Sequence, residues 1–203
     1  MQDEPLSGTR AAAICAEIRR KYRAVADSPA GAFPYPIGRE SALGLGYEEG
    51  WIESIPPEVI DRFVGVGNPF RVESPREGDR VLDLGCGCGL DSFVASRLVG
   101  SRGAATGVDL TPEMLEIARR GLPSWPHRNL RFFEASAESL PFDKEAFDLV
   151  ISNGALNLVA DKDAAFRQVR RLLRPGGRFV AADLLIDEAV PEEVLARQDA
   201  WSS

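Results

Sequence analysis

The chain has 203 residues, 44% of them hydrophobic, and a formal net charge of -7. Its length predicts one globular core with an additional segment, and its acidic balance disfavours nucleic acid and anionic membrane surfaces as partners. The sequence contains no apolar stretch near the roughly 20 residues of a membrane span and no visible leader, and its three cysteines suit a reducing compartment. We therefore expect a cytoplasmic protein.

The first third of the chain predicts a helical segment. Four residues recur at helical spacing and predict an amphipathic helix over about residues 9–26: Ile14, Ile18, Tyr22 and Val25. Residues 28–50 are rich in glycine, proline and aromatic residues and are expected to form a loop. A short helix is expected to begin near Pro57.

We place a boundary near residue 75. Residues 1–75 are expected to form a helical cap over the crevice of the following core, 76–203, and to set substrate choice. Tyr22, Tyr35 and Glu40 are candidate lid residues in this cap.

After the boundary, strand-like and helix-like segments alternate. Short apolar runs predict five strands at 80–84, 104–109, 130–134, 147–152 and 178–185. Helices are expected at 90–99, from Pro112 with Thr111 as the N-cap, at 161–173 with Phe166 facing inward, and from Pro191. This alternation predicts an α/β fold with right-handed crossovers and a parallel five-strand sheet with flanking helices.

Residues 80–89 place a glycine loop between the first strand and its helix. Gly85, Gly87 and Gly89 follow at every second position, whereas a dinucleotide fingerprint needs its third glycine one position later. Asp83, two residues before the first glycine, would repel a pyrophosphate but would suit an ammonium group. A nicotinamide-dependent oxidoreductase is therefore the less favoured alternative.

Asp109 is the second informative residue. It ends the second strand, 20 residues after Gly89, where an acid accepts hydrogen bonds from two ribose hydroxyls. The alternative is an acid that complements the dipole of the following helix, which contributes only about 0.3–1 kcal/mol.

The glycine loop, preceded by Asp83, resembles motif I of class I S-adenosylmethionine-dependent methyltransferases. The resemblance implies a Rossmann-like core that binds S-adenosyl-L-methionine and methylates a small molecule. It also implies a final strand hairpin, for which this sequence shows no counterpart. No catalytic residue is assigned and no metal is expected.

Two later segments extend this resemblance. Residues 136–142 resemble the segment that flanks adenine, so Ala137 and Glu138 would contact the base; the alternative is a surface loop. Residues 147–153 resemble the motif IV strand, and Asn153 would lie beside the methionine end of the cofactor or the substrate; the alternative is a turn-forming Asn. The implied cofactor-binding residues are Asp83, Gly85, Cys86, Gly87, Gly89, Asp109, Leu110, Met114, Ala137, Glu138 and Asn153.

Residues 63–187 show a narrower resemblance to arsenite methyltransferases, carried by Gly67-Asn68-Pro69, Gly89-Leu90-Asp91-Ser92, 107–115, 151–153 and 157–162. That family holds As(III) with several cysteine thiolates, which are soft ligands. This chain has Val66 and Gly154 at two positions where the resemblance implies cysteine. Arsenite is therefore disfavoured as the acceptor.

The three cysteines of this chain do not provide an equivalent set of arsenic-binding thiolates. Cys86 and Cys88 lie in the glycine loop and are interpreted as small loop residues, and Cys15 is distant in sequence.

The end of the chain predicts an open sheet edge. The fifth strand would expose unpaired backbone groups and apolar side chains, which favours self-association. We therefore keep a second interpretation, in which the chain is a cofactor-binding but inactive truncated homologue or a partner subunit.

Overall fold

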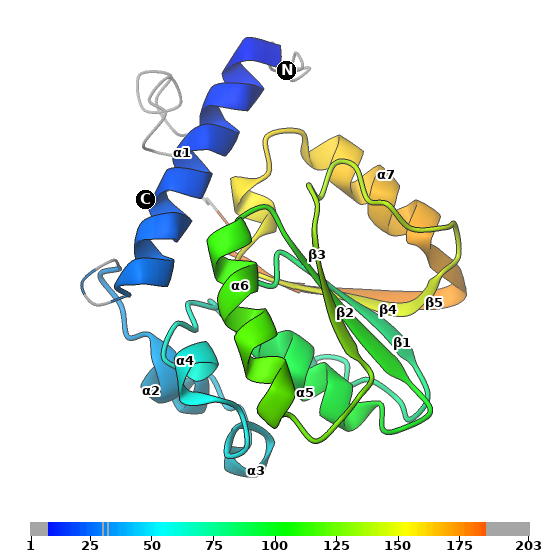
Figure 1. Ribbon diagram of the computed structural model, residues 1–203. Helices are drawn as coiled ribbons and strands as arrows, with labels where there is room; N and C mark the ends of the chain where they lie inside the picture. Colours follow the sequence, from blue (N-terminus) through cyan, green and yellow to red (C-terminus); the bar gives the residue numbers. More distant parts are fainter. Residues whose placement is uncertain (1–7, 30, 32, 186–203) are drawn as a thin grey trace.

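A parallel sheet of five strands lies at the centre of the fold, in the order β3-β2-β1-β4-β5 (Figure 1). The computed structural model describes residues 8–29, 31 and 33–185. The order reverses between β1 and β4, and in such sheets ligands bind at the carboxyl ends of the strands beside this point. The strands are β1 (Arg80–Leu84), β2 (Ala104–Asp109), β3 (Leu130–Glu134), β4 (Phe147–Asn153) and β5 (Leu173–Ala182).

Helices cover both faces of the sheet, as the α/β prediction requires. Val81 of β1 packs in one hydrophobic cluster with α5 (Leu90–Leu98) and α6 (Pro112–Gly121). Leu82, the next residue, packs on the other face with α7 (Lys162–Leu172). Successive strand residues point to opposite faces, so the continuous apolar run of β1 follows from burial on both sides.

Two helix starts differ in how they are capped. Asp161 caps α7 through its side chain, which accepts a hydrogen bond from Ala164 N. Thr111 occupies the predicted N-cap of α6, with Pro112 next, but its side chain makes no capping bond. Instead, Asp109 accepts a hydrogen bond from Thr111 N at 2.8 Å.

The segment before β1 is more helical than predicted. α1 (Gly8–Asp27) and α4 (Pro57–Ile60) match expected helices, but 28–50 is not only loop, because it contains α2 (Gly38–Gly44) and the start of α3 (Glu49–Ile52). A distant contact fixes α2: Gly38 N donates to Phe63 O at 2.7 Å. The residue composition of 28–50 gives no indication of this contact, so the helix could not be predicted from it.

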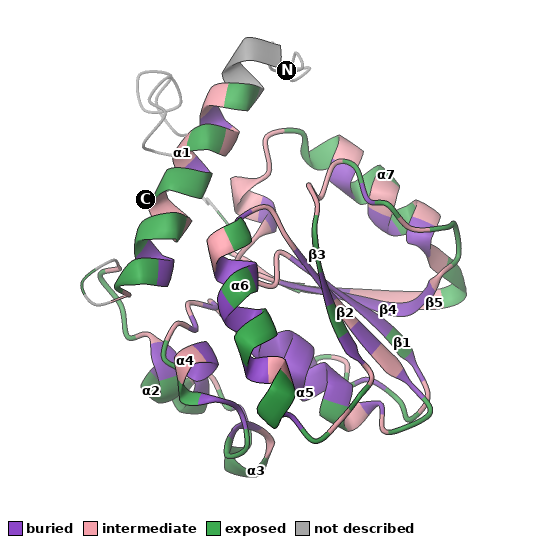
Figure 2. Ribbon diagram, in the orientation of Figure 1, coloured by how far each residue is buried: buried purple, intermediate pink, exposed green. Residues whose placement is uncertain are grey.

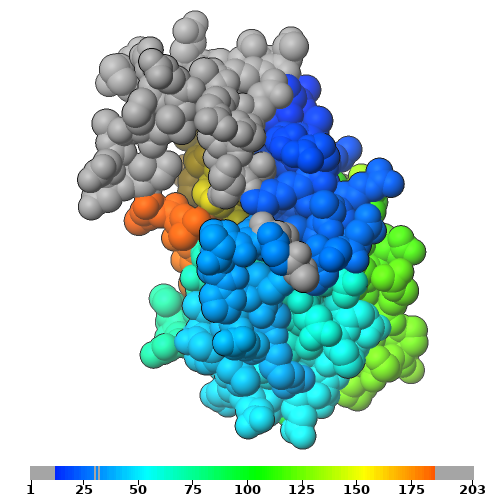
Figure 3. Space-filling view, turned by 90° about the vertical axis from the view of Figure 1, so that its left-hand side faces the viewer, coloured from blue at the N-terminus to red at the C-terminus, as the bar shows by residue number. Residues whose placement is uncertain are grey.

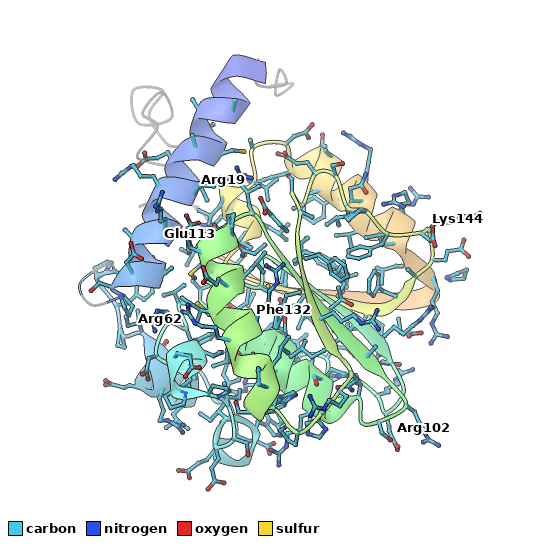
Figure 4. All side chains as sticks on the ribbon, in the orientation of Figure 1. Arg19, Arg62, Arg102, Glu113, Phe132 and Lys144 are labelled. Carbon is cyan, nitrogen blue, oxygen red and sulfur yellow. The ribbon has the colours of Figure 1, made fainter. Side chains whose placement is uncertain are left out.

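This segment packs onto the core and does not stand apart from it. α1 contacts α6, where Arg23 pairs with Glu113 at 3.3 Å, and Arg19 of α1 pairs with Glu134 at 3.6 Å (Figure 4). Buried residues of α3 and α4 join the same cluster as Val81, and α3 contacts α5 while α4 contacts α6; Figure 2 shows α5 coloured mostly as buried. The boundary near residue 75 remains a prediction.

The predicted bounds of β5 were wrong at both ends. The strand runs over Leu173–Ala182, because an irregular register at Phe147/Leu149 lets Leu173 pair with Phe147. The strand ends at Ala182. The carboxylate of the next residue, Asp183, accepts hydrogen bonds from Leu156 N and Asn157 N at 2.8 and 3.2 Å, which draws the chain out of the sheet.

Phe166 also differs from its prediction. It is 46% exposed and contacts Phe179 at a ring-centroid distance of 6.0 Å, because it lies at the rim of the α7–sheet contact and not beneath it. The helix predicted from Pro191 lies outside the described residues. Three short 3-10 turns complete the described fold: η1 (Pro69–Arg71), η2 (Leu122–Ser124) and η3 (Leu156–Leu158). Among the helices described, none combines the length and apolarity of a membrane span.

Candidate functional site

A cavity opens at the carboxyl ends of β1, β2 and β4, and we call it the central cavity. It encloses about 1110 Å³ of empty space, part of which is open solvent. Of the eleven residues predicted to bind the cofactor, ten line it, and Asp83 does not. The ten are Gly85, Cys86, Gly87, Gly89, Asp109, Leu110, Met114, Ala137, Glu138 and Asn153.

The glycine loop has a backbone that only glycine adopts easily. Gly85, Gly87 and Gly89 have φ values of +76°, +52° and +91°. A Cβ at Gly85 would lie 2.2 Å from the Cβ of Ala155, so the chain also passes too close for a side chain. Gly85 N and Cys86 N both donate to Val108 O at 2.9 Å, which ties the loop to β2.

Asp109 lies at the cavity wall, where backbone groups hold its carboxylate. Gly87 N donates to its Oδ2 at 2.8 Å and Thr111 N donates to its Oδ1 at 2.8 Å. An ionised carboxylate only accepts hydrogen bonds, so the hydroxyl groups of a ligand would donate to it. Burial raises the pKa of Asp109, and the two backbone hydrogen bonds lower it. This geometry fits a diol such as a ribose.

The structure places Asp83 and Asp91 differently. Asp83 is buried beneath α5, where Ser92 Oγ donates to its Oδ2 at 2.6 Å, and it does not reach the cavity wall. Asp91, in the first turn of α5, does line the cavity. Burial raises the pKa of Asp91 to about 6, and hydrogen bonds from Tyr47 and Asn153 oppose that rise. Sequence reasoning assigned Asp91 no role, although an acid two residues after the last loop glycine was visible.

Asn153 is held in a buried polar junction with Tyr47 and Asp91. Its Nδ2 lies 3.0 Å from Asp91 Oδ2, 2.8 Å from Gly67 O and 3.1 Å from the Tyr47 hydroxyl. Its Oδ1 accepts from Val66 N at 2.9 Å and Gly67 N at 3.1 Å. The Tyr47 hydroxyl donates to Asp91 Oδ1. Asn153 therefore lines the cavity while its polar atoms hold the chain that precedes β1.

Glu138 connects the predicted adenine segment to the start of α7. Its backbone N donates to Ser136 Oγ at 3.2 Å, and its Oε1 accepts from Asp161 N at 2.8 Å. Because these bonds close the turn at 136–139, Ala137 and Glu138 are held at the cavity wall.

All three cysteines line the same cavity. Burial raises the pKa of Cys86 well above its usual value and that of Cys88 to about 12. Burial and the negative charge of Glu138 also raise the pKa of Cys15, which lies in α1. The structure thus brings together thiols that are distant in sequence, but all three favour the protonated form. The described residues include no group of three or more His, Cys, Asp and Glu side chains arranged for a metal ion.

The segment before β1 forms the outer wall of the cavity. Ile18 and Tyr22 of α1 line it, and burial raises the pKa of Tyr22. Figure 3 shows this segment, in blue and cyan, spread over one face of the molecule. Arg62 also reaches the wall, but its Nε donates to Ala26 O at 2.7 Å and its Nη1 donates to Glu58 O at 3.2 Å (Figure 4). The acids Asp91, Asp109 and Glu138 therefore suit a ligand that carries positive charge.

Comparisons with known proteins agree with this geometry. A family model described as "Methyltransferase domain" matches residues 75–202. An arsenite methyltransferase of Halobacterium salinarum is 36% identical over 156 residues, which cover 77% of this chain and 40% of that protein. A ubiquinone/menaquinone biosynthesis C-methyltransferase of Shewanella frigidimarina is 36% identical over 130 residues, covering 64% of this chain and 50% of that protein.

The solved structures include a relative of the same kind. The crystal structure of an arsenic (III) S-adenosylmethionine methyltransferase from Chlamydomonas reinhardtii superposes with a TM-score of 0.65 at 37% identity, covering 72% of this chain and 51% of that one. The chain spans about half or less of the length of these relatives. Because the family model covers more than half of the chain, the chain belongs to the S-adenosylmethionine-dependent methyltransferase family.

Proposed function

We propose that this chain binds S-adenosylmethionine in the central cavity and transfers its methyl group to a small molecule. The observation that carries the proposal is Asp109, whose carboxylate lines the cavity beside the glycine loop and is held there by hydrogen bonds from Gly87 N and Thr111 N.

Each part of the wall has a proposed role. Asp109 accepts hydrogen bonds from the ribose hydroxyls, and Ala137 and Glu138 hold the adenine. The loop from Gly85 to Gly89 lets the backbone approach the ligand closely. Asp91, and not Asp83, faces the positive charge, because only Asp91 lines the cavity.

The cofactor supplies an electrophilic methyl group on a positively charged sulfur. When bound, the cofactor would supply this methyl group to a lone pair on the acceptor, and the electron pair of the carbon–sulfur bond would stay on sulfur. Any proton on the acceptor atom leaves to water. Proximity and in-line alignment can supply most of the rate, so the chain needs no dedicated general base.

The two positions at which the family resemblance implies cysteine argue against arsenite as the acceptor. Val66 and Gly154 face each other, because a Cβ at Gly154 would lie 3.4 Å from Val66 Cγ1. Neither residue carries sulfur, and the buried thiols of Cys86 and Cys88 resist ionisation. We therefore propose an acceptor that is not a thiophilic metalloid.

Calorimetric titration with S-adenosylhomocysteine and with NAD tests the cofactor half of the proposal. We expect binding of S-adenosylhomocysteine only, and binding of NAD alone would overturn the proposal. Because the chain matches only 40–44% of the length of the arsenite methyltransferase relatives, a cofactor-binding subunit without activity is the second candidate. Transfer of radiolabel from S-adenosylmethionine to a small molecule would distinguish the two.

A further inference from the structure

A second hollow, which we call the outer groove, lies beside the central cavity. It encloses about 940 Å³ of empty space, part of it open solvent, between α2, the chain at 65–66 and Leu184. Gly65 lines both the outer groove and the central cavity. The two spaces are therefore neighbours with a single residue in common.

Gly65 makes the wall between them thin. A Cβ at this position would lie 2.5 Å from Asn153 Nδ2 and 2.4 Å from a ring carbon of Phe63. Only glycine lets the chain pass there without displacing those side chains. The two spaces therefore meet at Gly65, with the side chains of Phe63 and Asn153 packed against it.

The sheet order also puts the outer groove on the correct side. The proposed adenine and ribose contacts come from the ends of β3 and β2, and the glycine loop follows β1. The next strands are β4, which ends at Asn153, and β5, which leads to Leu184. A cofactor laid across β3, β2 and β1 thus points its reactive end toward β4 and the outer groove.

The lining of the outer groove indicates the chemistry of its occupant. Tyr35, Leu45, Val66 and Leu184 offer apolar surface, and Ser41 adds a hydroxyl. Glu40 is the only charged residue among the described residues that line it, and within the described structure its carboxylate pairs with no other side chain. An anionic molecule would meet this carboxylate with no compensating cation.

We propose that the outer groove is the subsite for the methyl acceptor. The acceptor is a small molecule with an apolar body and a cationic or hydrogen-bond-donating group that faces Glu40. This inference rests on the proposed methyl transfer, and it adds the place and the class of the acceptor.

The chain offers a matched pair of variants for the test. Gly44 in α2 lines the outer groove, and Gly50 in α3 lines neither space. A Cβ at either position meets no atom within 4 Å, and neither residue has a positive φ. Gly44→Phe should therefore fill the outer groove without damaging the fold, and Gly50→Phe is its control.

The probes are 2-phenylethylamine, 2-phenylethanol and phenylacetate, which share a ring and differ in charge. Each is titrated into the full chain saturated with S-adenosylhomocysteine. We expect the amine to bind tightest and the acid weakest. Gly44→Phe should weaken amine binding by roughly tenfold or more, whereas Gly50→Phe should leave it unchanged. S-adenosylhomocysteine should bind the wild type and both variants equally.

The outcomes separate the two proposals. Failure of the wild type to bind S-adenosylhomocysteine would contradict the proposed function itself. Three outcomes would overturn the acceptor subsite alone, provided that S-adenosylhomocysteine binds normally. They are that no probe binds, that phenylacetate binds tightest, or that Gly44→Phe leaves amine binding unchanged.

Discussion

Asn153 at the end of β4 donates a hydrogen bond to Asp91 Oδ2 at 3.0 Å, although the two residues lie 62 positions apart. Tyr47, from the segment before β1, donates to the other oxygen of the same carboxylate. One buried acid therefore joins three separate parts of the chain at the wall of the central cavity.

Tyr47→Phe should destabilise the protein. The change removes one hydroxyl that donates to a buried carboxylate and keeps the ring contacts with Phe63 and Phe70, at 5.4 and 6.1 Å. We expect the free energy of unfolding to fall by about 1.5–3 kcal/mol, measured by urea denaturation. Tyr35→Phe, at a residue that is 39% exposed, is the control. Equal losses in the two variants would contradict the role of the junction.

The apoprotein should become less stable as pH rises from 5 to 8. The folded pKa of Asp91 is raised to about 6 from its ordinary value of 3.8, so its contribution to stability is fully present below pH 3.8 and is lost as pH rises through about 6. We expect a loss of about 1–2 kcal/mol over this range from Asp91 alone. Burial also raises the pKa values of Asp83 and Asp109, which act in the same direction.

The pH dependence of the unfolding free energy in Asp91→Asn tests this assignment. The variant should show a flatter dependence than the wild type, whatever its absolute stability. A slope equal to that of the wild type would show that other groups carry the effect.

Asp109→Ala should weaken S-adenosylhomocysteine binding by about 1–3 kcal/mol, because two ribose hydrogen bonds are lost. Calorimetry gives the affinity. Thermal melting of the apoprotein reports any loss of stability that results from removing the hydrogen bonds from Gly87 N and Thr111 N. Glu116→Ala, on the exposed face of α6, is the matched control. An affinity equal to that of the control would refute the ribose assignment.

The loop thiols should react slowly with iodoacetamide at pH 8. Burial raises the pKa of Cys88 to about 12 and that of Cys86 well above its usual value, so few thiolates form. Peptide mapping by mass spectrometry should find Cys15 alkylated first, because the pKa values of the two loop thiols are raised more strongly than that of Cys15. Alkylation in urea gives the reference rates. Native rates as fast as those in urea would show that the loop thiols are accessible and ionised.

The exposed edge of β5 should drive self-association. Within the described residues β5 pairs only with β4, and Ala181 on β5 is exposed. Sedimentation velocity should show concentration-dependent association of the wild type, which Ala181→Lys reduces because a lysine opposes edge-to-edge pairing. Ala16→Lys, on the exposed face of α1, adds the same charge elsewhere. A single monomeric species at all concentrations would contradict the prediction.

The sequence predicted the core well because its signals are local. β2 and β3 have the predicted bounds, since short apolar runs between turn residues define them, and the glycine loop and Asp109 lie together at the cavity. The elements that were missed depend on distant contacts. α2 is fixed by the bond between Gly38 and Phe63, and the junction of Tyr47 with Asp91 spans 44 positions. Asp83 was placed at the ligand from its spacing, but the strand turns it beneath α5 toward Ser92.

The hydrophobic cluster that includes Val25, Ile52 and Ile60 also contains Val81 and Phe93 of the core. The segment before β1 and the core beneath the central cavity therefore share one set of packed side chains. Exchange of the first 75 residues between relatives would carry ten of the 28 buried residues of that cluster with it, and those ten would have to pack against a foreign core. With the acceptor subsite that we propose, a change of acceptor would therefore be more accessible through single positions along α2 than through exchange of the whole segment.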